Sequence, residues 1–389
     1  MSPSGRVGRY IMQPEGYRAF IPVALPPSPP VVLSDATNHL LSQADIALGR
    51  LDGAIRTLPD ADQFTLMYVR KEAVLSSRIE GTRSSLDDVL RDEAGVPGRR
   101  PADVTEVRNY VAAMGHGLSL LESLPISVRL IREVHRVLLA GVRGSERQPG
   151  EIRTTQNWIG FAGATLAQAS FVPPPPHEVG PALANLERFI HDESPMPFLV
   201  RSALVHAQFE TIHPFLDGNG RVGRLLLTLM LCDRGLLSKP VLYLSEYFAM
   251  NQLRYYDLLQ AVHDEGAWEE WIAFYLRGVN EVAERSAEAA YDILELRESH
   301  RHLVTTEFGR RAASGLLLLD HLFSEPILNV NRVGEITSLT YRAAADLVEQ
   351  FVLHDLLEEI TGQSRNRQFR YSPYVGIFGG LWGRDAGGR

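Results

Sequence analysis

Apolar residues recur at helical intervals over most of this chain, and that spacing favours a mainly helical fold. In the segment that begins near Asp60, for example, Phe64, Met67, Tyr68 and Leu75 follow a helical period. We expect helices at about residues 34–58, 60–80, 104 onward, 127–139, 181–192, 198–212, 221–234 and 251–301. A chain of 389 residues exceeds the roughly 250 to 300 at which one core stops growing, so two or three packed units are expected.

Two segments depart from the helical pattern. Residues 153–172 contain β-branched and aromatic side chains typical of strands, and Gly160 and Gly163 could form the bend of a hairpin. The run of four prolines at 173–176 ends it. The first 34 residues are rich in proline and indicate an extended arm. The predicted fold class is therefore mainly α with one small β-hairpin.

The carboxy-terminal segment has its own pattern. Helices are expected at about residues 316–323, 333–337 and 341–353, followed by a hairpin around 362–366. Three helices followed by a β-wing resemble a winged helix-turn-helix domain. We therefore divide the chain into an amino-terminal arm and helical region (1–100), a central core (101–300) and a winged-helix-like module (301–389).

Composition narrows the range of partners and compartments. The formal net charge of -8 provides no overall attraction for nucleic acid or an anionic membrane, so a protein or nucleotide partner is the better expectation. The one cysteine, Cys232, lies in an apolar run and is expected in the core. A single cysteine cannot form an internal disulfide, and we find neither a membrane-length apolar run nor a signal-peptide pattern. These observations favour the cytoplasm.

The residues from His213 to Arg224 combine several features of a phosphate-binding site. Gly218-Asn219-Gly220 can turn tightly into a helix that begins near Arg221. A helix amino terminus directs free N–H groups and the positive end of the helix dipole toward an anion. Arg221 and Arg224 are three residues apart, which makes them neighbours on that helix and suits them to a polyphosphate.

Two further side chains precede the turn. Asp217 supplies a hard oxygen ligand, and Mg²⁺ is usually bound through one or two carboxylates and nucleotide phosphates. His213 is the nearby side chain that can accept a proton near neutral pH. Each residue alone has an ordinary explanation, such as a surface turn or a solvated arginine. Their ordered combination makes coincidence improbable.

The stretch His213-Pro214-Phe215-Leu216-Asp217-Gly218-Asn219-Gly220-Arg221-Val222-Gly223-Arg224 resembles the complete signature of the Fic family. Residues 150–176 are similar to the family's flap region, and residues 251–259 also match. The resemblance spans about residues 60–290. It implies a helical Fic core with a hairpin flap, and transfer of AMP from ATP to a serine, threonine or tyrosine hydroxyl of a protein.

The resemblance also implies roles for the signature residues. His213 would be the general base, and Phe215 would pack into the core and hold the loop. Asp217 would bind Mg²⁺ between the α- and β-phosphates. The anion hole would be formed by Gly218, Asn219 and Gly220, with Asn219 on the α-phosphate.

Other positions follow from the same resemblance. Arg221 and Arg224 would bind the outer phosphates, and Asn251, with Tyr255 or Tyr256 beside it, would contact the nucleoside. Ile159 in the flap would dock the target segment. Doc-type relatives, which transfer the γ-phosphate, have lysine where this chain has Gly220, so glycine favours AMP transfer. Phosphocholine transfer is also known in the family and is not excluded by the motif.

A second motif precedes the core. Ser76-Ser77-Arg78-Ile79-Glu80-Gly81 matches the family's inhibitory motif, in which the glutamate pairs with the arginine at the position of Arg224. Independently, a carboxylate in the last turn of a helix faces the negative end of the dipole and requires a cation. We therefore expect Ser76 and Glu80 to restrain the enzyme, whereas the alternative is a solvated glutamate beside Arg78.

The sequence of the carboxy-terminal module does not determine which kind of partner it binds. Residues 331–371 contain five arginines and six acidic residues, which is not the basic footprint of a DNA-binding domain, although the wing itself is locally positive. DNA contact is therefore not favoured over protein docking or formation of a homodimer. Two other functions remain alternatives to AMP transfer: removal of AMP from a modified protein, and a DNA-binding regulator with a Fic-fold sensor.

Overall fold

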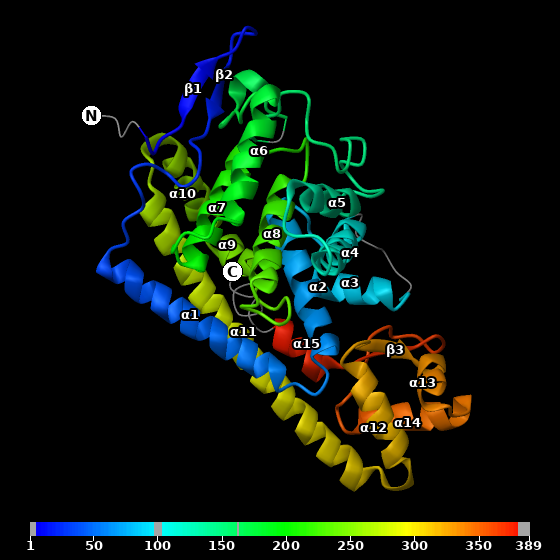
Figure 1. The fold of residues 1–389 in the computed structure, drawn as a ribbon. Helices are drawn as coiled ribbons and strands as arrows, with labels where there is room; N and C mark the ends of the chain where they lie inside the picture. Colours follow the sequence, from blue (N-terminus) through cyan, green and yellow to red (C-terminus); the bar gives the residue numbers. More distant parts are fainter. Residues whose placement is uncertain (1–4, 97–102, 162, 380–389) are drawn as a thin grey trace, which may run out of the picture.

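The protein is a mainly helical molecule in a computed structural model that describes residues 5–96, 103–161 and 163–379 (Figure 1). Helices before the signature are α1 (Asp35–Arg56), α2 (Ala61–Ile79), α3 (Leu86–Glu93), α4 (Val104–Leu121), α5 (Val128–Leu138), α6 (Pro176–Ile190) and α7 (Phe198–Ile212). Those after it are α8 (Asn219–Asp233), α9 (Leu244–Met250), α10 (Gln252–Glu265), α11 (Trp268–Glu307), α12 (Ala312–Leu322), α13 (Val330–Thr337), α14 (Tyr341–Leu353) and α15 (Ser372–Gly379). The strands are β1 (Arg9–Met12), β2 (Arg18–Ile21), β3 (Ile327–Asn329), β4 (Glu358–Glu359) and β5 (Gln368–Arg370).

Helices α7 and α8 form the centre of the core. Nearly every residue of both is buried, including polar side chains such as His206 and Arg224. Helix α8 is surrounded by α2, α4, α5 and α7, whereas the long helix α11 packs along α1 and α7 (Figure 1). The signature connects α7 to α8, so a buried scaffold holds both ends of the loop.

Helix α2 has clear start and stop signals. The side chain of Asp60 accepts a hydrogen bond from the backbone N–H of Gln63 and caps the amino terminus. The helix ends at Ile79, with Glu80 as the C-cap and Gly81 in a left-handed conformation at φ 93°. The predicted stop at Gly81 is confirmed, and it places Glu80 at the open carbonyl end of the helix.

Several elements differ from the expectation. The proline-rich arm contains an antiparallel pair, β1–β2, in which Tyr10 lies opposite Phe20. In the described part of 153–172, which leaves out residue 162, one β-bridge between Ile159 and Phe171 closes the flap in place of the expected strands. The single helix predicted over 251–301 is also wrong, because Gly266, at φ 69°, separates α10 from α11.

The carboxy-terminal module contains helices α12, α13 and α14 and a three-stranded antiparallel sheet in the order β3-β5-β4. Helix α15 then returns to the core, where Tyr374 packs its ring 6.5 Å from Phe64 of α2. Helix α11 is continuous through residue 301. The proposed boundary at 100/101 falls within residues 97–102, which lie outside the described part of the chain. The winged-helix interpretation and the domain boundaries stay predictions. None of the described helices is long and apolar enough to cross a membrane.

Candidate active site

His213 lies where α7 ends. It is the C-cap residue and adopts a left-handed conformation at φ 48°, which turns the chain sharply away from the helix. Its Nδ1 is 3.3 Å from the backbone carbonyl oxygen of Glu210. Because a carbonyl only accepts, Nδ1 must carry the proton, and Nε2 keeps its lone pair free. This is the tautomer that a general base requires.

Burial favours the neutral form of this imidazole. Desolvation, supported by the nearby charge of Arg153, lowers the pKa of His213 to about 4, although the Glu210 carbonyl and Glu80 act in the opposite direction. His213 is therefore unprotonated at neutral pH, and it remains partly exposed. A partly exposed neutral imidazole at the end of a rigid helix can accept a proton from a bound hydroxyl.

The loop after His213 is locked by its own side chains. The amide of Asn219 donates to the carbonyl oxygen of Phe215 and accepts from its N–H, both at 2.8 Å. Phe215 is fully buried, as predicted, and its ring stacks on that of His135 with centroids 3.7 Å apart. The Asn219 side chain is thus engaged by Phe215, so an anion in the hole would meet the backbone N–H groups of this turn.

His135 is a positioning residue that the sequence analysis missed. Its Nδ1 accepts a hydrogen bond from the N–H of Gly150 at 2.7 Å, and its Nε2 therefore donates to the carbonyl oxygen of Asp217 at 2.9 Å. Burial lowers the pKa of His135 to about 4, which keeps this neutral bridge intact. The ring connects α5 to the loop that carries Asp217.

Two residues at the base of the flap also hold the signature and were not predicted. Arg153 is 2% exposed, and its Nε and Nη2 donate to the carbonyl oxygens of His213 and Pro174 at 2.9 and 2.6 Å. Asn157 donates to the carbonyl oxygens of His213 and Phe215. The flap and the signature loop are therefore one hydrogen-bonded unit, which only the folded structure could show.

Asp217 is positioned at the entrance to α8. Its Oδ1 accepts from the N–H of Gly218 at 2.6 Å and lies 3.5 Å from Nη2 of Arg221. Its Oδ2 accepts no hydrogen bond within the described ranges. A Cβ on Gly144 would come within 2.8 Å of that oxygen, so only glycine allows the neighbouring loop to approach so closely. No cluster of three potential metal ligands exists among the residues that the structure describes. One available carboxylate oxygen nevertheless suits Mg²⁺, which completes its shell with phosphate and water oxygens.

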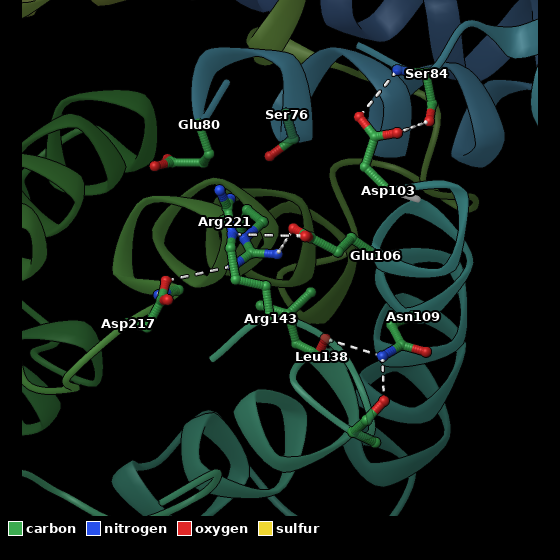
Figure 2. Close-up of polar contacts among 12 residues, drawn as sticks. Ser76, Glu80, Ser84, Asp103, Glu106, Asn109, Leu138, Arg143, Asp217 and Arg221 are labelled. Carbon is green, nitrogen blue, oxygen red and sulfur yellow. Dashed lines mark hydrogen bonds and ion pairs between the residues drawn. The ribbon is translucent and has the colours of Figure 1, made fainter. Parts of the chain in front are cut away.

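Arg221 is not solvated. Its side chain is 1% exposed, and Nη1 donates to Oε2 of Glu106 on α4 at 3.1 Å (Figure 2). Figure 2 also shows Asp217 on the side of Arg221 opposite Glu106. The guanidinium therefore lies between two carboxylates, and its predicted contact with the outer phosphates stays a prediction.

Arg224 binds the end of α2. Its Nη2 is 2.7 Å from Oε1 of Glu80, and its Nε donates to Oγ of Ser76 at 2.9 Å. The same Nη2 donates to the backbone carbonyl oxygen of Ser76 at 3.0 Å. Burial works against the charge of both partners, yet their attraction prevails, so the pKa of Glu80 is lowered and that of Arg224 is raised. The pairing that was expected for Glu80 is present, and it also provides the cation that the negative end of α2 requires.

The carboxylate of Glu80 covers the start of α8. A Cβ built on Gly220 would lie 2.2 Å from Oε1 of Glu80 and 2.9 Å from Nη1 of Arg224. Any other residue at position 220 would displace one of these two groups. Glu80 therefore sits against the first turn of α8, where the predicted anion hole begins.

The predicted nucleoside contacts lie at the junction of α9 and α10. Asn251 joins the two helices, and the adjacent Gln252 donates to the carbonyl oxygen of Ile79, so this junction touches the end of α2. Tyr255 is buried, and its hydroxyl bonds to His206 at 2.9 Å. Tyr256 is 45% exposed. Of the two tyrosines, Tyr256 is therefore the one with a surface available to a ligand.

The flap residue Ile159 is 38% exposed, and Trp158 and Phe161 beside it are exposed as well. The N–H of Ile159 donates to the carbonyl oxygen of Phe171 at 2.8 Å, which fixes the backbone of this apolar surface. The structure thus gathers His213, Asp217 and the start of α8, with Glu80 against that start. Among the described residues, no hydrogen bond or ion pair joins Asn251 or Ile159 directly to these groups.

Two family models match the chain. The model described as the amino-terminal part of the Fic/DOC family matches residues 38–119, and the Fic/DOC family model matches residues 125–231. These two stretches carry the helix with Glu80 and the complete signature loop.

Curated proteins and solved structures agree with these models. The protein adenylyltransferase Fic-1 of Caenorhabditis briggsae is 33% identical over 210 residues, which is 50% of this chain but 39% of that protein. A probable protein adenylyltransferase of Aquifex aeolicus is 43% identical over 70 residues, or 18% of this chain and 22% of that one.

A Fic family protein from Desulfovibrio desulfuricans has a similar fold, with a TM-score of 0.56 at 20% identity, covering 88% of this chain and 97% of the other. A Fic-domain signaling protein from Bacteroides thetaiotaomicron has a TM-score of 0.50 at 19% identity, covering 66% and 95%. Because the two models match residues 38–119 and 125–231, which contain the Glu80 helix and the complete signature, this part of the chain belongs to the Fic/DOC family.

Proposed function

We propose that this protein transfers AMP from ATP to a serine, threonine or tyrosine hydroxyl of a protein, with release of pyrophosphate. The observation that carries the proposal is the pairing of a neutral His213, with Nε2 free, and the amino terminus of α8 on one short, locked loop. A base and an anion site this close together fit the attack of a hydroxyl on a phosphate. The chain spans only 39% of its curated adenylyltransferase relative from Caenorhabditis briggsae, which is why the activity is a proposal.

In the proposed reaction, Nε2 of His213 accepts the proton of the target hydroxyl. The hydroxyl oxygen forms a bond to the α-phosphorus as the bond from that phosphorus to the bridging oxygen breaks, and pyrophosphate leaves with the bond's electrons. The backbone N–H groups at the start of α8 would meet the charge on the α-phosphate. Catalysis would thus come mainly from positioning and electrostatics.

We assign Mg²⁺ to Oδ2 of Asp217, since that oxygen accepts no hydrogen bond within the described residues and a carboxylate is the hard donor that the ion prefers. A bound Mg²⁺ would neutralise charge on the leaving pyrophosphate. His135 keeps Asp217 in place by bonding its backbone carbonyl.

Glu80 is the proposed restraint on this activity. Its carboxylate holds Arg224 and lies against Gly220, so the γ-phosphate would have to displace it to reach the arginine. An arginine–carboxylate pair is directional and competes for the donors that a phosphate needs. ATP would bind, but in a misplaced pose.

The flap is the proposed target-docking surface. Main-chain groups and the exposed side chain of Ile159 lie on a segment that Arg153 and Asn157 join to the signature loop. Pairing of a target strand along this segment would bring a hydroxyl toward His213 independently of most of the target sequence.

The structure does not favour DNA binding by the carboxy-terminal module. Arg370 of the wing bonds Asp87 of α3 at 2.9 Å and Glu358 at 2.8 Å, and Arg332 pairs with Glu325 and Glu335. Two of the five arginines in this region are therefore held by carboxylates. Protein docking or dimer formation is the better proposal for this module.

The activity is tested with ATP labelled either at the α- or at the γ-phosphate, with the Glu80→Gly variant as the enzyme. Label from α-labelled ATP should become covalently attached to the protein or to a lysate protein, and label from γ-labelled ATP should not. Attachment of the γ label would show that the protein transfers the γ-phosphate rather than AMP. If neither label is attached, but AMP is released from a protein modified beforehand, the removal reaction would be favoured.

A further inference from the structure

Glu106 of α4 connects two arginines rather than one. Its Oε2 accepts from Nη1 of Arg221 at 3.1 Å, and its Oε1 lies 3.6 Å from Nε of Arg143. Figure 2 shows both guanidinium groups directed at this carboxylate. The shared carboxylate of Glu106 offsets the repulsion between these two positive charges.

The two arginines differ in how firmly they are held. The Arg221 side chain is 1% exposed and makes a hydrogen bond, whereas that of Arg143 is 61% exposed and lies beyond hydrogen-bond distance from Glu106. Because Arg143 is largely solvated and makes no hydrogen bond to Glu106, this contact is weaker than the buried, hydrogen-bonded pair of Glu106 with Arg221. Arg143 can therefore leave Glu106 at little cost, but Arg221 cannot.

The backbone beside Arg143 reaches the proposed metal ligand. Gly144 is at φ 90°, and a Cβ there would be 2.8 Å from Oδ2 of Asp217. The loop is anchored further along, where Arg132 donates to the carbonyl oxygen of Gly150 at 2.7 Å and His135 bonds the Gly150 N–H. Arg143 thus projects from a fixed loop next to the entrance of α8.

Binding of a triphosphate would require a further positive charge at this site. The three arginines 143, 221 and 224 are matched by three carboxylates, namely Glu80, Glu106 and Asp217. A triphosphate brings several negative charges into this cluster, while Arg221 stays committed to Glu106. An exposed arginine that can exchange a weak carboxylate contact for a phosphate would supply the missing charge, and a guanidinium suits phosphate geometry.

We propose that Arg143 is a further phosphate-binding residue, which moves from Glu106 to the β- and γ-phosphates of the bound nucleotide. The inference rests on the proposed function only in taking ATP as the ligand. It predicts that Arg143 discriminates by phosphate number, contributing to the binding of ATP and hardly to that of AMP.

The test measures binding by calorimetry in the Glu80→Gly, His213→Ala background, which frees Arg224 and prevents turnover. Adding Arg143→Gln should weaken ATP binding about tenfold, as expected for a charge-assisted bond to phosphate, and AMP binding less than about twofold. Arg143→Lys should restore part of the loss. The matched control is Arg147→Gln, which removes an arginine of the same loop that is 59% exposed and pairs only with its neighbour Glu146 among the described residues.

Each result decides the matter. Equal ATP affinity in the Arg143→Gln and Arg147→Gln proteins would overturn the inference, as would an equal loss for ATP and AMP. Melting temperatures of the variants, measured without nucleotide, should agree within a few degrees, since the lost contact is exposed. A selective loss for ATP in this background, together with no label transfer by the Glu80→Gly protein that keeps His213, would support Arg143 while refuting AMP transfer. If the background protein binds neither nucleotide, both proposals fall.

Discussion

Replacing Glu80 with glycine should release the proposed restraint. In the present structure Nη2 of Arg224 lies 2.7 Å from Oε1 of Glu80, and the arginine is 3% exposed. A hydrogen bond to a charged group contributes about 1.5 to 3 kcal/mol. Because every 1.4 kcal/mol corresponds to a factor of ten, loss of this bond should raise the productive population of bound ATP by about ten- to a hundredfold.

The arginine should keep its place in the variant. Two contacts to Ser76, to its hydroxyl and its carbonyl oxygen, do not involve Glu80 and remain available. The unliganded variant should therefore fold, with a stability loss of about 1 to 3 kcal/mol for the buried charge that loses its partner. ATP should restore part of this stability by supplying a new anion.

The assay is self-modification with α-labelled ATP and magnesium, compared between the native protein and Glu80→Gly. The expected result is at least a tenfold higher initial rate, and Arg224→Ala added to the variant should abolish the gain. Glu122→Gly is the control, because Glu122 is likewise a helix C-cap, at the end of α4, and is exposed. The reasoning is refuted if Glu80→Gly gives no increase over Glu122→Gly across a range of ATP and magnesium concentrations.

Four further predictions follow from individual contacts. His213→Ala should lower transfer by about 10²- to 10⁴-fold in a steady-state assay while ATP binding is kept, and an unchanged rate would remove His213 from the mechanism. Ile159→Asp should raise the KM for a target protein far more than the Kd for ATP, whereas a parallel loss would assign the flap to the nucleotide. Gly220→Ala should lower the free energy of unfolding in urea by about 1 to 3 kcal/mol in the native protein, because the added Cβ meets the Glu80 carboxylate. The same change should cost much less in the Glu80→Gly variant, and equal costs would contradict that contact. The pKa of His135 is about 4 in the folded protein against a usual 6.5. Its neutral form therefore contributes about 3 kcal/mol to the free energy of unfolding above pH 6.5, and this contribution is lost as the pH falls toward 4. His135→Asn should flatten the profile of stability against pH in that window.

Contiguous features of the site could be predicted from the sequence. The signature lies on one loop, so its spacing alone placed His213 before the turn and Arg221 after it. The helix over 198–212 was predicted with its bounds because apolar residues continue to the histidine that caps it. The close approach of Glu80 to Arg224 was also expected, although only the resemblance to a family connected two residues so far apart in the chain.

Most of the missed features depend on tertiary contacts. His135, Arg153 and Glu106 lie on elements remote from the signature, and nothing in their local sequence indicates which backbone group or side chain they will meet. The flap strands were predicted from β-propensity, but the flap backbone pairs at one bridge, between Ile159 and Phe171. The side chains of Arg153 and Asn157 bond carbonyl oxygens of the signature loop instead. The β1–β2 pair was overlooked because prolines dominate the composition of the arm.

The central claim is that this loop transfers AMP with His213 as the base. The most direct measurement is mass spectrometry of the Glu80→Gly protein after incubation with ATP and magnesium, beside the Glu80→Gly, His213→Ala protein. The account predicts a mass increase of one AMP moiety on a serine, threonine or tyrosine of the first protein and none on the second. An added phosphate group in place of AMP, or an equal AMP gain in both proteins, would contradict it.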